Sequence, residues 1–441
     1  MKSAKTIGLW SATALVAGNI IGAGAYMLPS LLAPYGKWGL VGWLIAGIGA
    51  VALALVFAQM ANWVPTASGP YSYTKLVFGD FVGFQVAFGY WFVCSAGNAL
   101  LVFTIIGYMS VFVPALKSDH DLALIISLVL IWGATIINVI GIKFASAVQV
   151  CITILKLIPL ALFAVLGLFF FSPDVFCQAP LSANTTTWEA MSSTTSVALL
   201  SFLGLESATI PAGETHNPQK TIPRATILGV LIALFVYVLG TIVIMGSIPQ
   251  TVLAKSLAPY VDSCRVLFGE TAAKLMGIMG IIGCIGTLNG WVLLQGQAPL
   301  TAAREGLLPA VFMRVNKNGV PVFSLVLGSV MMSVVAVVYY SYNLLKQVEY
   351  IGLLNVFTAV VPYLYVSIAA GIFAKKMRSK ISIGHFRTIV ALSAVAFIFS
   401  FWVIAGFSAE TVFWGMMWFL VGIPLYLFIG KTKSRTGLSG N

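Results

Sequence analysis

Two ionisable residues stand inside long apolar stretches of the sequence: Lys156 in CITILKLIPL and Glu206 in SFLGLESATI. At the centre of a bilayer-spanning helix an ionisable residue costs about 2.5 to 3.5 kcal/mol, so it normally faces a cavity or a partner. A lysine ammonium can donate to backbone carbonyls, and a carboxyl group can bind a proton or accept hydrogen bonds. The sequence therefore predicts polar chemistry at membrane depth, centred on these two residues.

Glycines interrupt the first apolar stretch, which reads GNIIGAGAYMLPS from residue 18. Gly22 and Gly24 flank Ala23 and leave the backbone uncovered. Because a bilayer core offers no water to a freed backbone group, a broken helix is tolerated only where it lines a cavity or is buried in protein. Two half-helices meeting here would direct a helix N-terminus, with its partial positive charge and N–H groups, at an anionic group such as a carboxylate.

A second interruption falls in the sixth apolar stretch, where residues 201–207 read SFLGLES. Small residues alone also fit the close packing of two helices. If ten helices form two repeats of five, however, the first and sixth spans are equivalent, and paired interruptions in equivalent helices indicate a solute site. An odd number of helices in each repeat makes the repeats inverted. The pair of interruptions therefore favours a binding site over packing alone.

The composition shows that these stretches belong to a membrane protein. Of the 441 residues, 60% are hydrophobic and 8% are charged, whereas soluble domains have about 45 to 50% apolar and 25% charged residues. The mean hydropathy is +1.00. About twelve stretches are long enough to cross a bilayer core of about 30 Å. The predicted fold class is an all-α integral membrane protein with about 12 transmembrane helices, of which helices 1 and 6 are broken.

The same pattern predicts how the chain is divided. We expect residues 1–172 to form a first five-helix repeat and residues 173–375 a second, inverted five-helix repeat. Residues 376–441 would form helices 11 and 12 with a cytoplasmic tail. No stretch remains for a soluble domain.

The residues that give the net charge of +12 lie mainly in the predicted loops. If both termini are cytoplasmic, 17 of the 24 Lys and Arg residues lie on the cytoplasmic side and six on the other, with Lys156 inside a span. This bias predicts cytoplasmic termini, and it accounts for the positive charge without nucleic acid as a partner. The first apolar run is longer than the core of a signal peptide and has no clear cleavage site, so we expect a retained helix.

Cysteine and histidine give no support for catalysis. All three His residues fall in predicted loops, and no HExxH, GxSxG, P-loop or CxxC pattern occurs. We therefore expect no enzyme activity, no metal and no cofactor. Cys177 and Cys264 fall in loops predicted to be extracellular, where a disulfide between them stays open.

Five segments, in order along nearly the whole chain, resemble the amino acid/polyamine/organocation (APC) transporter superfamily. They are GNIIGAGAYMLP, SGPYSYTKLVFG, SFLGLESA, NPQKTIPRA and VPYLY. Within the superfamily, the sequence is most similar to bacterial basic amino acid/polyamine antiporters of the arginine/agmatine type. The resemblance implies a leucine-transporter-like fold of 5+5 inverted helices plus two more, in a bacterial inner membrane. Related antiporters are dimers, so the sequence leaves open whether this chain forms a homodimer.

The resemblance also implies which residues bind the substrate backbone. They are Ile20, Ile21, Gly22, Ala23, Gly24 and Leu203. The stretch from Ile21 to Gly24 would hold the substrate α-carboxylate, and the carbonyls near Ile20 and Leu203 would accept from its α-amino group.

Further residues match side-chain contacts and gates of the same family. Asn98 would contact the substrate side chain, and could also be a simple interhelical hydrogen bond. Trp291 would pack on the aliphatic stem of the substrate as a middle gate, although an isolated Trp is commonly a packed core residue. Tyr90, Glu206 and Tyr363 match a cluster that forms a lower gate and senses protons. A carboxyl in an apolar environment agrees with that role, because burial disfavours its charged form.

Three departures from the arginine/agmatine pattern weaken the expectation of strict arginine selectivity. Leu200 stands where those antiporters carry a tryptophan that stacks on the guanidinium, so a cation–π contribution of about 0.5 to 2 kcal/mol is lost. Asn355 replaces a serine that meets the guanidinium. Ala23 replaces a serine of the carboxylate cradle.

Lys156 is a fourth departure, because those antiporters have an apolar residue there. In this respect the chain is similar to proton-coupled and heteromeric-type amino acid transporters of the superfamily, whose lysine ammonium takes the place of a coupling sodium ion. We expect the ammonium to contact carbonyls freed near Gly18 and Asn19 and so to bridge spans one, five and eight. The alternative is that the side chain reaches a membrane interface.

Two readings of the function follow. The first is a secondary active transporter, either an antiporter that exchanges a cationic, arginine-like amino acid for its amine or another amino acid, or a proton-coupled symporter of broader or neutral specificity that uses Lys156. The second is a channel or a membrane receptor, but a pore would show rings of charge or filter carbonyls. The expected partners are small amino acids or amines, the lipid bilayer and, as an open alternative, protons.

Overall fold

The computed structural model describes residues 7–65, 67, 69–140, 142–177, 186–209, 215–341 and 344–435. Throughout these ranges the regular structure is helical, apart from one isolated bridge between Ile7 and Thr215. Eleven helical segments among them are long and apolar enough to cross a membrane. They are α1 with α2 and η1 (Leu9–Ile20, Ala23–Leu32, Ala33–Tyr35), α3 (Trp38–Trp63), α5 (Asp80–Met109), α6 (His120–Ile140), α7 (Ile142–Gly167), α10 (Pro218–Met245), α13 (Glu270–Arg304), α14 (Val322–Ser341), α15 (Leu344–Lys376), α16 (Ile383–Ala405) and α17 (Ala409–Arg435).

Shorter helical pieces connect or extend these segments. They are α4 (Pro70–Phe78), η2 (Pro114–Lys117), η3 (Leu168–Phe170), α8 (Pro173–Phe176), α9 (Thr187–Leu199), η4 (Leu200–Phe202), η5 (Ser207–Thr209), α11 (Gln250–Leu253), α12 (Pro259–Phe268), η7 (Ala310–Met313) and η8 (Arg378–Lys380). The twelfth expected span, around residue 200, is therefore divided into α9, η4 and η5, and no single helix there reaches spanning length.

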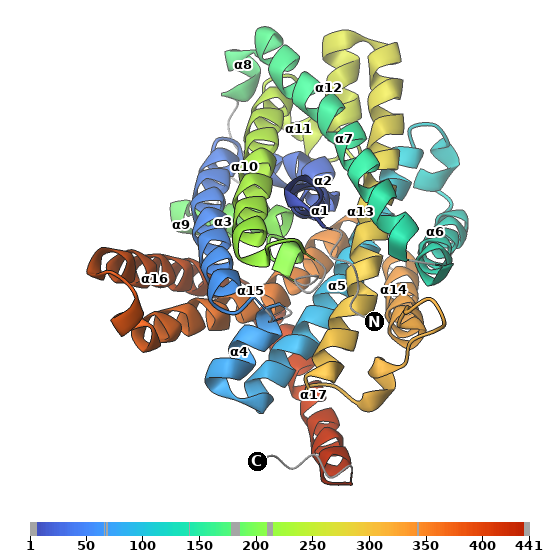
Figure 1. The fold of residues 1–441 in the computed structure, drawn as a ribbon. Coiled ribbons are helices and arrows are strands. Elements are labelled where there is room, and N and C mark those ends of the chain that lie inside the picture. Colours follow the sequence, from blue (N-terminus) through green and yellow to red (C-terminus); the bar gives the residue numbers. More distant parts are fainter. Residues whose placement is uncertain are drawn as a thin grey trace.

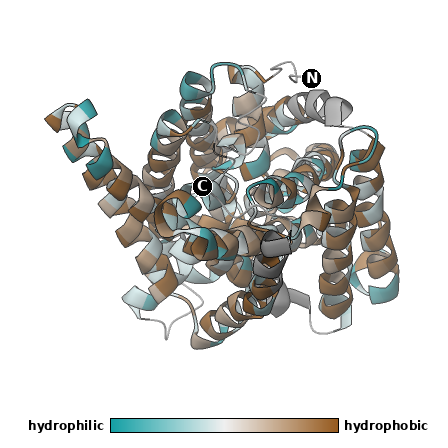
Figure 2. Ribbon diagram, turned by 60° about the horizontal axis from the view of Figure 1, so that its bottom comes forward, coloured by the Kyte–Doolittle hydropathy of each residue, from teal (hydrophilic) through white to brown (hydrophobic). Residues whose placement is uncertain are grey.

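The chain is a multi-pass membrane protein, and the outward faces of its helices agree with this. Large apolar side chains are exposed on peripheral helices, where lipid would cover them. Examples are Ile125 on α6, Leu162 on α7, Val334 on α14, Ile398 on α16 and Val421 on α17. Figure 2 shows the same pattern, with apolar residues over most of the helical ribbon and hydrophilic residues gathered toward helix ends and loops.

Helices α1 and α2 lie in the middle of the molecule, with α10 and α3 on one side and α13 on the other (Figure 1). Helix α1 contacts α10, α7 and α13, while α13 packs along α5 and α7. The first span is therefore enclosed by other helices, which is the setting in which a broken backbone is tolerated.

Both predicted interruptions exist. Helix α1 ends at Ile20 and α2 begins at Ala23, so the chain is non-helical at Ile21 and Gly22. The second interruption follows η4, where Gly204 has φ +100°, a conformation that favours glycine. The two breaks also touch: a Cβ added at Gly24 would stand 2.8 Å from Ser201 Cα. Glycine at this position permits the close approach of the two segments.

The short helix α4, which carries the SGPYSYTKLVFG motif, is tied to the end of α13. Tyr71 hydrogen-bonds Thr301, and Ser72 Oγ donates to Glu305 Oε1 at 2.5 Å. Lys75 Nζ donates to the Glu305 carbonyl at 2.5 Å. These contacts hold the connection between α3 and α5 against α13.

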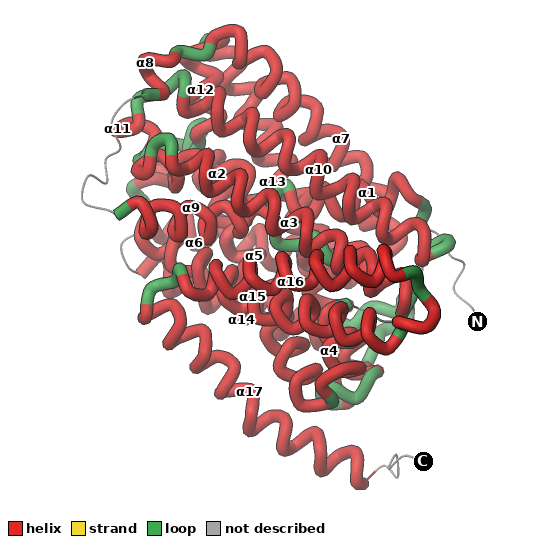
Figure 3. The backbone as a smooth tube through the Cα atoms, turned by 90° about the vertical axis from the view of Figure 1, so that its left-hand side faces the viewer, coloured by secondary structure: helices red, strands yellow, loops and turns green. Residues whose placement is uncertain are grey.

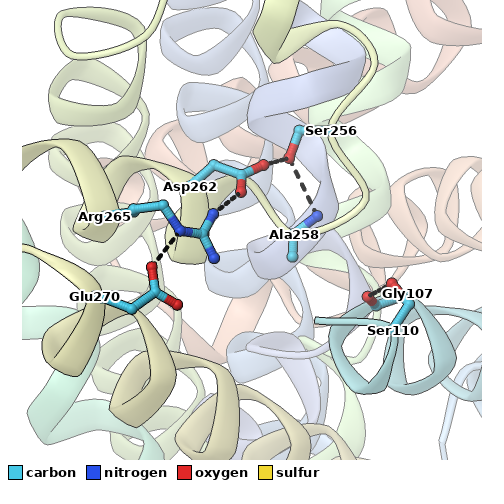
Figure 4. Close-up of polar contacts among 7 residues, drawn as sticks. All are labelled: Gly107, Ser110, Ser256, Ala258, Asp262, Arg265 and Glu270. Carbon is cyan, nitrogen blue, oxygen red and sulfur yellow. Dashed lines mark hydrogen bonds and ion pairs between the residues drawn. The ribbon is translucent and has the colours of Figure 1, made fainter. Parts of the chain in front are cut away.

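At the other end of α13, an ionic network joins α12 to the first turn of α13 (Figure 4). Arg265 donates to Asp262 at 2.8 Å and to Glu270 at 2.7 Å, and Ser256 Oγ donates to Asp262 at 2.5 Å. Cys264 on α12 is a free thiol, and so is Cys177. The disulfide that the sequence left open is thus absent between these two described residues.

Candidate functional site

A buried cavity of about 40 Å³ lies where the two interrupted segments meet. One water needs about 10 to 15 Å³ of such space, so the cavity has room for about three waters. Its lining includes eight of the residues predicted from the sequence. They are Ile20, Gly22, Ala23, Gly24, Leu200, Leu203, Trp291 and Asn355. An amino acid or diamine would fit only after the cavity widens.

The amino end of α2 faces this cavity. Helix α2 begins at Ala23, and its N-cap residue Gly22 makes no side-chain capping hydrogen bond. The first N–H groups of a helix have no partner within that helix, and they carry the positive end of its dipole. Since Gly22, Ala23 and Gly24 all line the cavity, this end can accept a carboxylate.

The carbonyl of Ile20 is less available than the sequence suggested. It accepts from Gly22 N–H at 2.9 Å and from Tyr237 Oη at 2.7 Å, which uses both of its lone pairs. A substrate amino group would have to displace one of these donors. The carbonyl of Ile21 is also engaged, because it accepts from Lys156, and Ile21 is not among the residues that line the cavity.

Lys156 on α7 is 1% exposed and joins three segments. Its Nζ donates to Gly18 O at 2.5 Å, to Ile21 O at 2.6 Å and to Thr287 Oγ1 at 2.6 Å. The ammonium therefore bridges α7, the first break and α13, as expected, and does not reach an interface. The expected contact with Asn19 is replaced by one with Ile21, and Asn19 O instead accepts from Trp291 Nε1 at 2.9 Å.

No carboxylate forms an ion pair with Lys156 among the residues that the structure describes. Its charge is met by three neutral oxygens. Two of them are carbonyls at the end of α1, where the helix dipole is negative. The break therefore creates the site that holds the lysine.

Glu206 is fully buried in the turn between η4 and η5. Tyr90 on α5 donates to its Oε1 at 2.7 Å, and Tyr363 on α15 donates to its Oε2 at 2.6 Å. The structure thus brings together the three residues that the sequence resemblance grouped. Each carboxylate oxygen has one hydroxyl donor, so the cluster ties the second break to two long helices.

Asn98 on α5 is placed differently from its expected role. It is buried but does not line the cavity, and its Nδ2 donates to Gln295 Oε1 on α13 at 2.8 Å. This is the interhelical hydrogen bond that the sequence left as the alternative. The neighbouring Gly97 lines the cavity instead.

Trp291 on α13 and Asn355 on α15 line the cavity from two helices that both pack against α5. The Trp291 ring passes over the second break, since a Cβ added at Gly204 would lie 2.8 Å from its Cζ2. Asn355 is 2% exposed, and its Oδ1 has no hydrogen-bond partner in the described structure. A buried amide oxygen without a donor is costly, so this atom is a candidate acceptor for a ligand.

Two important residues were missed from the sequence. Thr287 lies four residues before Trp291, which puts both on one face of α13, and a polar residue there could have been noticed. Tyr237 on α10 donates to Ile20 O and lies 3.1 Å from Ser201 O, so its hydroxyl links both breaks. A tyrosine in an apolar span needs a partner for its hydroxyl, but the sequence does not say which.

Comparisons with known proteins find matches along most of the chain. Residues 7–429 match the model of the amino acid permease family. The chain is 35% identical over 333 residues to the cadaverine/lysine antiporter of Escherichia coli K12, covering 76% of this chain and 74% of that protein. It is 29% identical over 424 residues to the putrescine transporter PotE of Haemophilus influenzae, covering 96% and 97%. It is also 29% identical over 458 residues to the arginine/agmatine antiporter of Chlamydia pneumoniae, covering 98% and 92%.

Proposed function

Because the chain belongs to the amino acid permease family, we propose that it is a secondary active antiporter that exchanges a cationic amino acid for its amine or another amino acid. Two relatives are antiporters of such pairs, cadaverine/lysine and arginine/agmatine, and a third transports putrescine. The bacterial relatives and the distribution of Lys and Arg support an inner membrane with both termini in the cytoplasm.

The observation that carries this proposal is the meeting of two interrupted helices at one buried cavity. The amino end of α2 supplies N–H donors for a carboxylate, and the Trp291 ring supplies an apolar wall for an aliphatic stem. Broken helices at a shared site are the arrangement by which secondary transporters bind a small zwitterion between two repeats.

The polar lining supports a substrate whose side chain ends in an ammonium group. No Asp or Glu lines the described part of the cavity, so a neutral acceptor must meet the distal charge. Asn355 Oδ1 is such an acceptor. A guanidinium would instead be recognised by stacking and by a planar pair of hydrogen bonds, and Leu200 offers no aromatic face. We therefore infer a lysine- or ornithine-like amino acid and its diamine as the preferred pair.

Alternating access would rearrange the contacts that close the cavity. Trp291 and Asn19 both line the cavity and are joined by a hydrogen bond, and the Tyr90, Glu206 and Tyr363 cluster joins the second break to α5 and α15. Transport then requires these contacts to open on one side while they stay closed on the other. Protonation of Glu206 would change this cluster from an ionic to a neutral one.

Proton-coupled symport of a broader amino acid set is the second candidate, and Lys156 favours it. The ammonium holds the carbonyls of the first break, and loss of its proton would weaken that hold without any sodium ion. Both candidates use the same cavity, so the driving force for uptake distinguishes them.

The test uses the purified full chain in liposomes. Vesicles loaded with unlabelled lysine, ornithine, arginine, cadaverine or agmatine are given labelled lysine or arginine outside, and empty vesicles are given the same label with and without a pH gradient. Antiport predicts uptake only into loaded vesicles, fastest with lysine or ornithine and cadaverine. Uptake into empty vesicles driven by the pH gradient alone would reject antiport in favour of symport.

Site variants show whether the cavity sets the selectivity. Leu200→Trp restores an aromatic face, so we expect arginine to gain on lysine by about 2- to 30-fold. Leu200→Met keeps the size without the aromatic face and serves as the control. An unchanged arginine-to-lysine ratio in Leu200→Trp would remove Leu200 from the substrate site.

A further inference from the structure

A second and larger cavity lies away from the substrate site, among α3, α10 and α16. Its volume is about 400 Å³, ten times that of the central cavity. Small-molecule sites commonly occupy about 300 to 1,000 Å³. Helix α3 packs against both α10 and α16, and Figure 3 shows it between them. The cavity therefore lies among these three helices and shares no lining residue with the central cavity.

The formally charged side chains around this cavity, Lys220 and Arg224, are both positive. Lys220 and Arg224 stand four residues apart on α10, and His385 lies in the first turn of α16. All three side chains are exposed, and no Asp or Glu is among the described residues that line the cavity. Both α10 and α16 begin here, so the positive ends of two long helices add to the field. This corner of the fold attracts an anion.

An amide donor in the same lining has no acceptor. Gln59 lies near the end of α3 and lines the cavity, and its Nε2 is buried without a hydrogen-bond partner in the described structure. A buried N–H donor without an acceptor costs about 1 to 3 kcal/mol. An oxygen acceptor placed in the cavity would satisfy it while it also meets the charges of Lys220 and Arg224.

Most of the remaining lining is apolar, apart from Asn62, Gln219 and Thr388, and it continues onto lipid-facing surface. Leu55, Ile227 and Leu392 contribute one aliphatic residue from each of the three helices. Beyond them on α10, Leu228 and Leu231 are exposed. A ligand seated here would have a charged head among Lys220, Arg224 and Gln59 and an apolar portion along α10.

We propose that this cavity binds the phosphodiester headgroup of an anionic phospholipid. The phosphate oxygens accept from Gln59 Nε2 and from the two α10 cations, and the acyl chains lie along the apolar faces of α10 and α16. The distribution of Lys and Arg predicts that this is the cytoplasmic side, where basic clusters next to spanning helices attract anionic lipids. A lipid is favoured over a soluble anion because the apolar lining continues onto the exposed face of α10.

Such a lipid would act on the helix that holds the substrate site together. Helix α10 carries Tyr237, whose hydroxyl reaches both breaks. A headgroup bound among α3, α10 and α16 would fix the start of α10 against its neighbours. The proposal does not depend on which solute is transported, since it concerns a different cavity.

The test is native mass spectrometry of the purified full chain, with phosphatidylglycerol or phosphatidylcholine added at increasing concentration. We expect the unmodified chain to retain phosphatidylglycerol in preference to phosphatidylcholine. The double variant Lys220→Gln/Arg224→Gln should bind phosphatidylglycerol at least about tenfold more weakly. The matched control is Arg314→Gln/Lys317→Gln, which removes two exposed cations on the same predicted side and should bind normally.

Two additional arms keep the test decisive. Ile227→Trp retains every charge but fills the cavity, so it should lose phosphatidylglycerol even if the charge variant folds poorly. Inorganic phosphate is added as a competitor and should not displace the lipid. The proposal is overturned if Lys220→Gln/Arg224→Gln or Ile227→Trp binds phosphatidylglycerol normally, if phosphatidylcholine binds equally well, or if inorganic phosphate displaces the lipid.

Discussion

Lys156 and Arg265 are both hydrogen-bonded cations, but their surroundings are opposite. Arg265 bonds two carboxylates, and its side chain is 40% exposed. Lys156 bonds two carbonyls and a hydroxyl, has no ion-pair partner among the described residues, and is 1% exposed. The cation that has carboxylate partners is therefore the exposed one, Arg265, where water weakens the ion pairs. Two of the three oxygens that hold the buried lysine are backbone carbonyls that are free to accept because α1 ends at Ile20.

The difference indicates which charges organise the fold. A buried charge that loses its partners is strongly destabilising, so Lys156 and the first break must form together. Glu206 follows the same rule with the opposite sign, since its partners are two tyrosine hydroxyls. Each buried charge thus holds one broken segment to two long helices. Variants of the buried and of the exposed charges test whether burial or charge pairing determines the effect on transport.

The largest effect is expected from Lys156→Met, which keeps an unbranched side chain without the ammonium. Gly18 O and Ile21 O would both lose a charged donor, and hydrogen bonds to charged groups contribute about 1.5 to 3 kcal/mol each. We expect exchange to fall by about 100-fold or more. Counterflow in liposomes measures it, with Lys274→Met, an exposed lysine on α13, as the control. Normal exchange by Lys156→Met would show that the break does not need the ammonium.

Thr287→Val should have the next largest effect. Valine keeps the methyl group that packs near Gly22, and it removes the hydroxyl that accepts from Lys156. The charge-assisted hydrogen bond from Lys156 is lost together with the hydroxyl's own donation to a backbone carbonyl, so we expect exchange to fall about tenfold. Thr287→Ser restores the hydroxyl and should recover most of the activity. Normal exchange by Thr287→Val, which keeps the methyl group and lacks only the hydroxyl, would show that the contact with Lys156 through this residue is not needed.

Glu206→Gln should change the response to pH more than the rate. The amide resembles the protonated carboxyl in shape, and its oxygen can still accept from one of the two tyrosines. We expect exchange at neutral pH to stay within about fivefold of normal, while its variation between pH 5 and 7.5 is largely lost. Initial rates across this range measure the effect, with Tyr90→Phe and Tyr363→Phe as controls that retain the carboxyl. A pH profile identical to that of the unmodified chain would mean that another group senses protons.

The breaks and the buried charges could be predicted from the sequence because they are local violations of an apolar pattern. Gly22 and Gly24 mark the first break, and Gly204 with Glu206 marks the second. Of the carbonyl partners of Lys156, Gly18 was predicted, but Ile21 was not, because the directions of the carbonyls follow from the backbone angles at Ile21 and Gly22. Family resemblance, not periodicity, grouped Tyr90 and Tyr363 with Glu206.

Rotation of helices about their axes was also beyond the sequence. Successive residues of an α-helix are turned by about 100°, so Gly97 lines the cavity while Asn98 faces Gln295. Tyr237 illustrates the same limit, since its reach to Ile20 and Ser201 depends on how α10 packs on both breaks. Residue type shows that a polar group needs a partner, but the choice of partner is made by tertiary packing.

The smallest effect is expected from Arg265→Gln, which changes the exposed cation. Glu270 raises the pKa of Arg265, mainly through their hydrogen bond, yet exposed ion pairs contribute little because water screens them. We expect exchange to change by less than about twofold, and thermal stability to differ from that of the unmodified chain only at low salt, where screening is weak. Melting curves at low and high salt, with exchange rates at both, measure this. A loss of exchange as large as that of Lys156→Met would mean that ionic contacts at the end of α13, and not burial at the break, control the transport cycle.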